Sequence, residues 1–226
     1  MRRLILALLL LASPYTLTGQ TEASTVRLAF QPAEARSITD ISTWNACGTP
    51  GMLVLDVLIT EAGETEEVGV RRSTPCLTQV AVGAVENWKF SPATFAGKAI
   101  ASRMPVAVMF DSQVSAPNPF PLPQLLSQRV AEVRAEFQPA EVTRAGFPPF
   151  HAGYTFAHGA VVLEVTLSAK GEAEDIKVLR DLPPFTANAK VVVGDWRFVP
   201  ATLSGHPVRS KVLLAFVSPP VPSTGP

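Results

Sequence analysis

The string Trp196-Arg197-Phe198-Val199-Pro200-Ala201-Thr202, closed by Gly205, decides how this chain is organised, because nearly the same string occurs earlier. The earlier copy is closed by Gly97 and reads Trp88-Lys89-Phe90-Ser91-Pro92-Ala93-Thr94. The same spacing aligns residues 51–110 with 159–218 without a gap, and about 21 of the 60 aligned positions are identical. We infer an internal duplication, which predicts two small modules of similar fold.

A second duplicated segment extends each repeat upstream, because the string VRLAFQPAE at 26–34 recurs as VRAEFQPAE at 133–141. Each repeat is therefore about ninety residues long, near the lower limit for an independent core. Between the repeats, alternate prolines from Pro117 to Pro123 are typical of a semi-rigid extended linker. The predicted domains are a first module at 24–112, a linker at 113–124, a second module at 125–218 and a disordered tail at 219–226.

The N-terminus is typical of an export signal over residues 1–20. Arg2 and Arg3 precede an apolar run from Leu4 to Ala12, and small and polar residues follow. This run is too short to span about 30 Å of hydrocarbon, which takes about 20 residues. We expect a periplasmic or otherwise exported protein; the alternative is an uncleaved segment that anchors the chain in the inner membrane.

Charge excludes one class of partner. The chain has 19 basic and 19 acidic residues and no net formal charge, and no basic stripe interleaved with aromatic residues is visible. Nucleic-acid binding needs such an electrostatic surface, so we expect no nucleic-acid partner.

Cys47 and Cys76 are the two cysteines of the chain, and an even pair in an exported protein favours a disulfide. The residues 51–60 and 65–72 are predicted to form a hairpin that turns near Gly63. The two cysteines flank its open end, where they could meet. The alternative, metal binding or redox catalysis by this pair, lacks a CxxC motif or a neighbouring histidine.

Alternating apolar residues predict the strands of each repeat. In the first repeat, Leu53 to Ile59 alternate around Asp56, which is expected on a solvated face, and a return strand ends before Pro75. The second repeat has equivalent strands over 159–168 and 173–180. Each repeat closes on a further strand, near 100–110 and 208–217. Pro105 predicts that the first of these closing strands lies at a sheet edge or is bulged.

Helical spacing follows each hairpin, and it ends in each case on a tryptophan. The positions in the two repeats are Leu77, Ala81, Val85 and Trp88, and Phe185, Ala189, Val192 and Trp196. Because each tryptophan completes an apolar stripe, we expect it in the core; the alternative is an exposed docking residue.

No arrangement of residues in the sequence predicts catalysis. His151, His158 and His206 have no zinc or triad spacing, and the acidic residues near Glu64 and Glu172 are explained by solvated strand faces. Nucleophile-elbow, phosphate-loop and dinucleotide motifs are lacking. We expect no enzyme activity, no metal and no cofactor.

Taken together, these features resemble the C-terminal domain of TonB. The resemblance rests on a glycine before an alternating strand (159–165), the Gly171-Glu172 turn, a helix ending in Trp-Arg-Phe-x-Pro-Ala, and a Gly-x-Pro-Val before the last strand. It covers about 51–110 and 159–218, and Phe147-Pro148-Pro149-Phe150 is similar to the family's lead-in. It implies an α+β fold of two tandem modules, each a three-stranded antiparallel sheet with a helix on one face.

The resemblance also implies a binding mode. In TonB the module pairs, by strand addition, with a short peptide of an outer-membrane receptor, and a free sheet edge offers unpaired backbone groups for this purpose. For this chain the role falls on the last strand of the second repeat, because Pro105 removes a donor from the first. The expected partner-binding residues are Val208, Arg209, Ser210, Lys211, Val212, Leu213 and Leu214, with Arg209 and Lys211 as outward charges.

Two hypotheses follow from the resemblance. One is an exported peptide-binding protein of the cell envelope, linked to TonB-dependent energy transduction and transmembrane transport. The other is a structural module whose two repeats pair their edges with each other or with a second copy by self-association. An energy transducer needs a membrane anchor and a long proline-rich spacer, and the predicted linker is too short to serve as that spacer.

Overall fold

The computed structural model describes residues 29–39, 51–110, 120–126, 137–148 and 159–218. The first repeat forms β1 (Phe30–Gln31), β2 (Glu34–Ser37), β3 (Gly51–Ile59), β4 (Thr65–Arg72), α2 (Leu77–Val85), β5 (Lys89–Ser91), β6 (Ala93–Phe95), β7 (Lys98–Ile100) and β8 (Ser102–Phe110). The second forms β9 (Phe137–Gln138), β10 (Glu141–Arg144), β11 (Gly159–Leu167), β12 (Ala173–Arg180), α3 (Phe185–Val193), β13 (Arg197–Val199), β14 (Thr202–Leu203), β15 (His206–Pro207) and β16 (Ser210–Ser218). The predicted strand and helix order of both repeats is confirmed.

The glycine of each predicted hairpin turn is required by the backbone. Gly63 and Gly171 have φ of 82° and 80°, which L side chains rarely adopt. A Cβ on Gly63 would lie 2.1 Å from the Phe90 carbonyl oxygen, and one on Gly171 would lie 2.3 Å from that of Phe198. The duplicated string therefore packs directly on the hairpin turn of its own repeat.

Both tryptophans of the duplicated string lie in the core, as the helical spacing predicts. Trp88 is 0% exposed and Trp196 is 3% exposed. Trp88 Nε1 donates to Thr39 Oγ1, and Trp196 Nε1 donates to the Gly146 carbonyl, both at 3.0 Å. A buried indole N–H needs such a partner, so these bonds fix the lead-in segment of each repeat against its helix.

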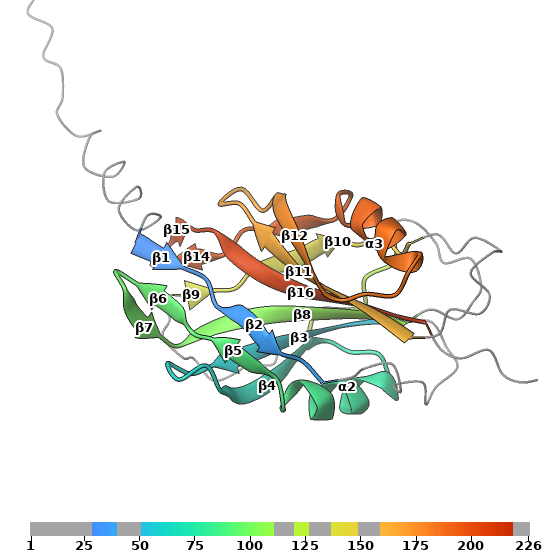
Figure 1. The fold of residues 1–226 in the computed structure, drawn as a ribbon, viewed down its shortest axis with the longest axis horizontal. Helices are drawn as coiled ribbons and strands as arrows, with labels where there is room; N and C mark the ends of the chain where they lie inside the picture. The colour runs from blue at the N-terminus through green and yellow to red at the C-terminus, as the bar shows by residue number, and fades with distance from the viewer. Residues whose placement is uncertain (1–28, 40–50, 111–119, 127–136, 149–158, 219–226) are drawn as a thin grey trace, which may run out of the picture.

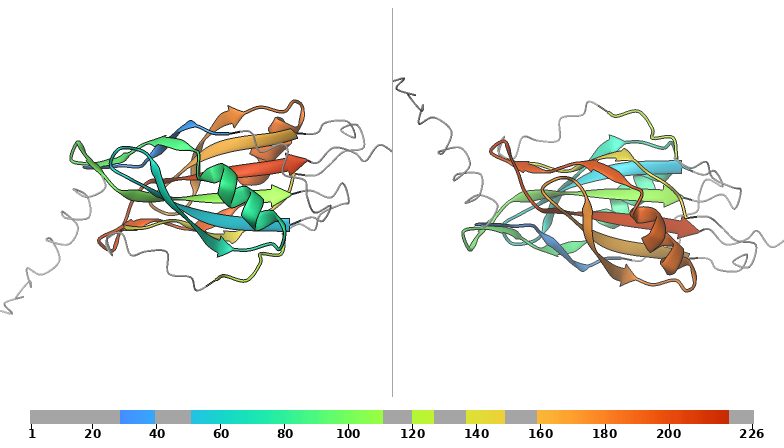
Figure 2. Two further views of the ribbon diagram at one scale, coloured as in Figure 1. Left: turned by 90° about the horizontal axis from the view of Figure 1, so that it is seen from below. Right: turned by 90° about the horizontal axis from the view of Figure 1, so that it is seen from above.

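The central sheet differs from the expectation of two separate three-stranded sheets. It has six strands in the order β12-β11-β16-β8-β3-β4. Each repeat supplies an antiparallel set of three, and β8 and β16 join the sets by a parallel ladder from Leu213↔Val106 to Val217↔Phe110. Figure 2 shows β8, in green, and β16, in red, side by side with their arrowheads in the same direction.

The expectation that Pro105 places the last strand of the first repeat at an edge is wrong, because β8 is a central strand. Pro105 pairs with Asp56 across the ladder to β3. The ladder to β16 begins only at Val106. The missing N–H of Pro105 therefore lies outside the parallel ladder, and no bond of that ladder is lost.

The parallel junction places the two helices on opposite faces of the sheet (Figure 1). Two equivalent strands that lie parallel to each other are related by a rotation about an axis parallel to the strands. This rotation exchanges the two faces of the sheet between the repeats. Each repeat then has one face covered by its own helix. The opposite face needs a cover from elsewhere, since it is also apolar.

The short ribbons of each repeat cover the bare face of the other repeat. The ribbon β2–β5 reaches the second module, where the Ala35 amide donates to Glu164. The ribbon β10–β13 reaches the first module, where Glu141 pairs with Arg72 at 3.3 Å. The rings of Phe30 and Phe137, equivalent residues of the two repeats, meet at 5.5 Å. The two modules therefore share one core.

Several predictions fall wholly or partly outside the described residues. They include the export signal at 1–20, the tail at 219–226, the linker at 113–124, of which only 120–124 are described, and the position of Cys47, which leaves its disulfide with Cys76 a prediction. Cys76 is the residue before α2, with φ of 72°. Among the described residues, neither α2 nor α3 has the length and the hydropathy that a membrane-spanning helix requires.

Candidate functional site at the junction of the modules

The expected partner-binding residues lie in or beside β16, but this edge is not free. Leu213 and Leu214 pair with Val106 and Ala107 of β8, and they are fully buried. Val208 is also buried and donates its amide to the Ala201 carbonyl. The sister module thus occupies the edge of β16 from Leu213 to Val217, which includes two of the seven residues expected to bind a partner.

Arg209 and Lys211, both expected as outward charges, differ from each other. The Arg209 side chain is 59% exposed, and its Nε lies 2.8 Å from Glu174 of β12. The Lys211 side chain is 12% exposed and lies between two carboxylates. Only Arg209 agrees with the expectation, since Lys211 points into the junction.

The outer strands of the six-stranded sheet are β4 and β12. The end of β4 carries a short addition from the segment 120–126, because Leu125 bridges to Arg72 and the Leu126 amide donates to the Arg71 carbonyl at 2.7 Å. In the part of the chain that the structure describes, β12 pairs with β11 alone. Its outer side is the longer open edge.

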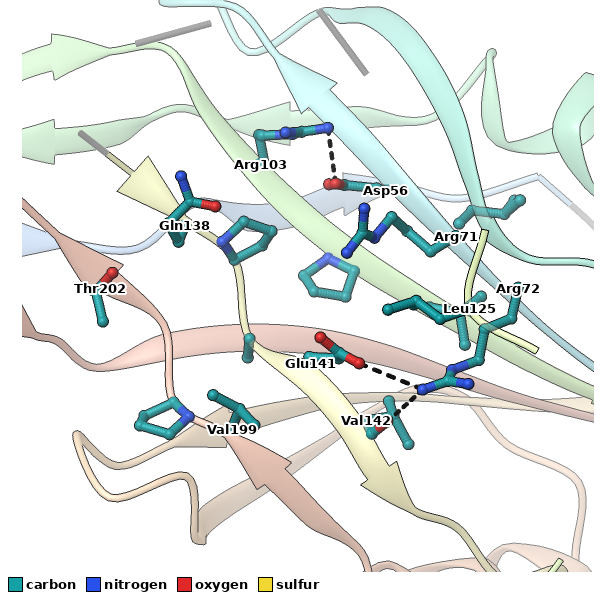
Figure 3. Close-up of a pocket in the computed structure, with 16 residues that line it drawn as sticks. Asp56, Arg71, Arg72, Arg103, Leu125, Gln138, Glu141, Val142, Val199 and Thr202 are labelled. Atoms are coloured by element: carbon teal, nitrogen blue, oxygen red, sulfur yellow. Dashed lines mark hydrogen bonds and ion pairs between the residues drawn. The ribbon is translucent and has the colours of Figure 1, made fainter. Parts of the chain in front are cut away.

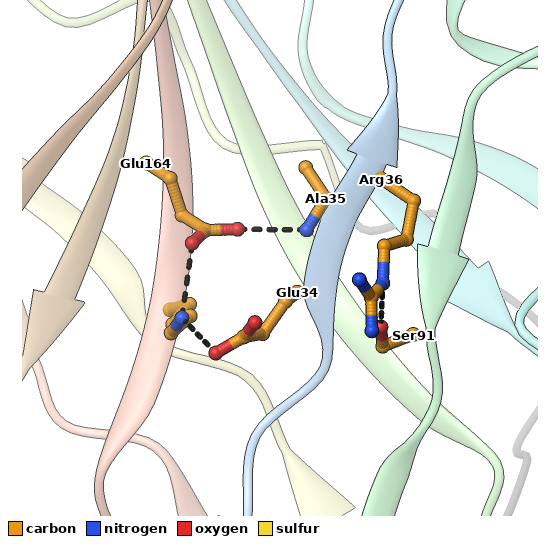
Figure 4. Close-up of polar contacts among 6 residues, drawn as sticks. Glu34, Ala35, Arg36, Ser91 and Glu164 are labelled. Carbon is orange, nitrogen blue, oxygen red and sulfur yellow. Dashed lines mark hydrogen bonds and ion pairs between the residues drawn. The ribbon is translucent and has the colours of Figure 1, made fainter.

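A closed polar cluster joins the first module to the second module at Glu164 (Figure 4). This side chain is 1% exposed, and its two oxygens are both used. Oε2 accepts the Ala35 amide at 2.7 Å, and Oε1 accepts Lys211 Nζ at 2.9 Å. Lys211 Nζ also donates to Glu34 Oε1 at 2.6 Å. A buried charge is tolerated only with such pairing.

These contacts shift the titration of the cluster. The hydrogen bond from Lys211, opposed by partial burial, holds the pKa of Glu34 below its ordinary value. Burial acts to lower the pKa of Lys211, but its hydrogen bonds to Glu34 and Glu164 outweigh it and raise that pKa. Both shifts favour the charged forms that hold the junction together.

The equivalent cluster of the first module, around Asp56, is open (Figure 3). Asp56 Oδ2 lies 2.7 Å from Arg103 Nη2, while Oδ1 has no hydrogen-bond partner. The contact is an ion pair rather than a well-directed hydrogen bond, because Nη2 and Nε of Arg103 also lack hydrogen-bond partners. Burial raises the pKa of Asp56, and the guanidinium groups of Arg103 and Arg71 oppose that rise.

The chain matches one known family model over residues 46–111 and 149–217, the C-terminal domain of the Gram-negative bacterial TonB protein. These two segments coincide with the two duplicated repeats. The chain belongs to this family. No curated protein and no solved structure matches it. The protein therefore carries two tandem TonB C-terminal modules, a type of envelope domain that interacts with proteins and is not catalytic.

The described histidine, cysteine and acidic side chains outside these two clusters form no metal site. No group of three or more histidine, cysteine or acidic residues that could hold a metal ion occurs among the described residues. His206 lies half-buried in β15, and His151 and His158 are outside the described ranges. The acidic residues of the hairpins, Glu64 and Glu172 among them, are exposed as expected.

Asp56 and Glu164 are the functional candidates that sequence reasoning missed. Asp56 was expected on a solvated face, and it is 2% exposed because β10 of the other module covers that face. The sequence does indicate that this face is buried, since Met52 and Val54 make the second face of β3 apolar too. Strands that are buried on both faces read as continuous apolar runs, and a carboxylate within such a run needs a partner.

Proposed function

We propose that the protein is an envelope binding protein that takes up an extended protein segment by strand addition at the outer edge of β12. The proposal rests on the order of strands in the sheet. In this order β12 is an outer strand, whereas β8 and β16 pair with each other. An extended segment gains backbone hydrogen bonds at an open edge, and its side chains supply specificity.

The surface of β12 suits a selective partner. Its exposed charges, Glu174, Asp175 and Lys177, discourage non-specific strand pairing, which is a common protection of edge strands. Arg209 extends this charged surface through its ion pair with Glu174. Of the residues on which the TonB resemblance places partner binding, Arg209 is thus the one that we place at the binding edge.

Membership of the TonB family supports an envelope location and a protein partner. We therefore propose that the protein acts in the periplasm and that its partner is a segment of an outer-membrane receptor. We also propose a link to TonB-dependent transport, and we propose no enzyme activity.

Site-specific photocrosslinking in Gram-negative cells tests this proposal. A crosslinking residue at Asp175 of β12 is compared with one at Glu67 of β4, which is the equivalent and equally exposed position of the first repeat. We expect a heterologous envelope protein to be captured from Asp175 and not from Glu67. Capture from Glu67 alone, or from both positions to the same extent, would contradict the assignment to β12.

A second function, structural assembly, is favoured by the β8–β16 ladder itself. Two modules that satisfy each other's edges already behave as an assembly unit, and further copies could add at β12 or β4. The same crosslinking experiment separates the two functions. Adducts between copies of this chain, with no other protein captured, would support the structural role.

A further inference from the structure

A cavity of about 290 Å³ lies beside the Asp56 cluster, between the first module's sheet and the ribbon β10–β13 of the second module. We propose that it binds a small carboxylate with an apolar body, such as the carboxyl end of a polypeptide or an N-acyl amino acid. Figure 3 shows the lining, which includes Asp56, Arg71, Arg103, Leu125 and Val199. This site is separate from the β12 edge and does not depend on it.

Among the described charged residues that line the cavity, one arginine is left without an ion-pair partner. Arg103 is paired with Asp56 at 2.7 Å, and Arg72 is paired with Glu141 at 3.3 Å. The Arg71 guanidinium lies near Asp56 but makes no hydrogen bond or ion pair with any described residue. A monoanion would balance this remaining charge, and a guanidinium matches the two oxygens of a carboxylate.

The second repeat provides a closed version of the same place. At its equivalent positions it has Glu164 for Asp56, Lys211 for Arg103 and Leu179 for Arg71. The longer Glu164 reaches the Ala35 amide at 2.7 Å, whereas Asp56 Oδ1 reaches no partner. The first repeat therefore has both room and an extra cation where the second repeat has an internal bond and an apolar side chain.

The rest of the lining selects the body of the ligand. Pro105, Pro139, Pro200, Leu125 and Val199 form apolar walls. Apolar walls with a few placed polar groups are typical of small-ligand sites. A compact dianion such as phosphate would leave these walls in contact with water, so the lining favours an apolar carboxylate.

Titration calorimetry on the full chain tests the site with defined probes. We expect heat from N-acetyl-leucine, and little from N-acetyl-leucinamide, which has the same body without the carboxylate. A five-residue peptide ending in leucine, with a free or an amidated carboxyl end, distinguishes the sources. Tighter binding of the free-ended peptide than of N-acetyl-leucine assigns the site to polypeptide ends, and weaker binding assigns it to small molecules.

Two variants connect binding to the proposed residues. Arg71→Leu copies the second repeat and should weaken N-acetyl-leucine binding at least about tenfold, the usual effect of losing a charge-assisted pair. Asp56→Glu should also weaken binding, because it fills the cavity as Glu164 fills its counterpart. Arg209→Leu removes an exposed guanidinium elsewhere and should leave binding unchanged.

Three binding results would contradict the proposed site. In the first, neither carboxylate probe binds; in the second, the amide probes bind as tightly as the matching carboxylate probes; in the third, inorganic phosphate at the same concentration competes fully with the carboxylate probes. Unchanged binding in Arg71→Leu or in Asp56→Glu would do the same. Thermal unfolding of each variant shows that it is folded, and these results do not bear on crosslinking at β12.

Discussion

Replacing Glu164 by leucine should destabilise the whole protein, because this carboxylate links the two modules. The change leaves the Ala35 amide buried without its acceptor and removes one of the two carboxylates around Lys211. Breaking one partner out of a buried ion pair costs about 3–5 kcal/mol. Glu34 remains beside Lys211, so we expect the lower end, about 3 kcal/mol.

Urea and thermal unfolding, followed by tryptophan fluorescence, measure this loss. Trp88 and Trp196 are buried in the two modules, so they report on both. A loss of about 3 kcal/mol corresponds to a fall in Tm of roughly 6–12 °C for a chain of this size. Because the modules share one core, a single unfolding transition should shift as a whole.

Matched variants separate the charge from the hydrogen bonds. Glu164→Gln keeps an acceptor and should cost only about 1–2 kcal/mol. Combining Glu164→Leu with Lys211→Met removes both buried charges and should recover part of the loss. Glu174→Leu breaks an exposed pair and should change stability by less than about 0.5 kcal/mol. A loss in Glu164→Leu no larger than in Glu174→Leu would contradict the role of Glu164 as a link between the modules.

Three further predictions concern the core, the hairpin turn and pH. Trp196→Ala should cost about 3–5 kcal/mol in urea unfolding, since it leaves a large cavity, and near-native stability would contradict core packing. Gly171→Ala should cost at least about 2 kcal/mol, because its Cβ would clash with the Phe198 carbonyl, and an unchanged urea midpoint would contradict this. The lowered pKa of Glu34 means that its stabilising effect is present above its ordinary pKa near 4.5 and is lost as pH falls further. Glu34→Gln should therefore lose less Tm than the wild type between pH 5 and 3, as measured by thermal scans, and an equal loss would argue against the Lys211 contact.

The local structure of each repeat could be predicted from the sequence. Apolar alternation predicts β3 and β11, and the spacing from Phe185 to Trp196 predicts α3. Local periodicity reports which residues of one segment share a face. It predicts elements well because the cause of each element lies within a few residues.

The joining of the two sheets could not be predicted in the same way. The pairing of β8 with β16, which are 107 residues apart, produces no periodic pattern in the sequence. The alternation of apolar residues in β16 is the same whether its edge is free or paired. One feature of the sequence does indicate that these strands are buried. Successive residues are apolar from Val106 to Phe110 and from Leu213 to Val217. Such runs indicate burial on both faces, but they do not say which strand lies alongside.

The candidate cavity depends on still finer differences. Asp56 and Glu164 occupy equivalent positions and differ by one methylene, and only the structure shows that the longer side chain reaches Ala35. The sequence comparison of the repeats marks the positions that differ, such as Arg71 and Leu179. It does not show which of these differences lie together around one space.

The two TonB modules join into one sheet through β8 and β16. Nuclear Overhauser contacts between backbone protons of Val106–Phe110 and Leu213–Val217 measure this junction directly in a monomeric sample. We expect contacts in the parallel register that pairs Ala107 with Leu214. Antiparallel contacts, or the absence of contacts together with rapid amide exchange along β16, would contradict it and restore the free edge.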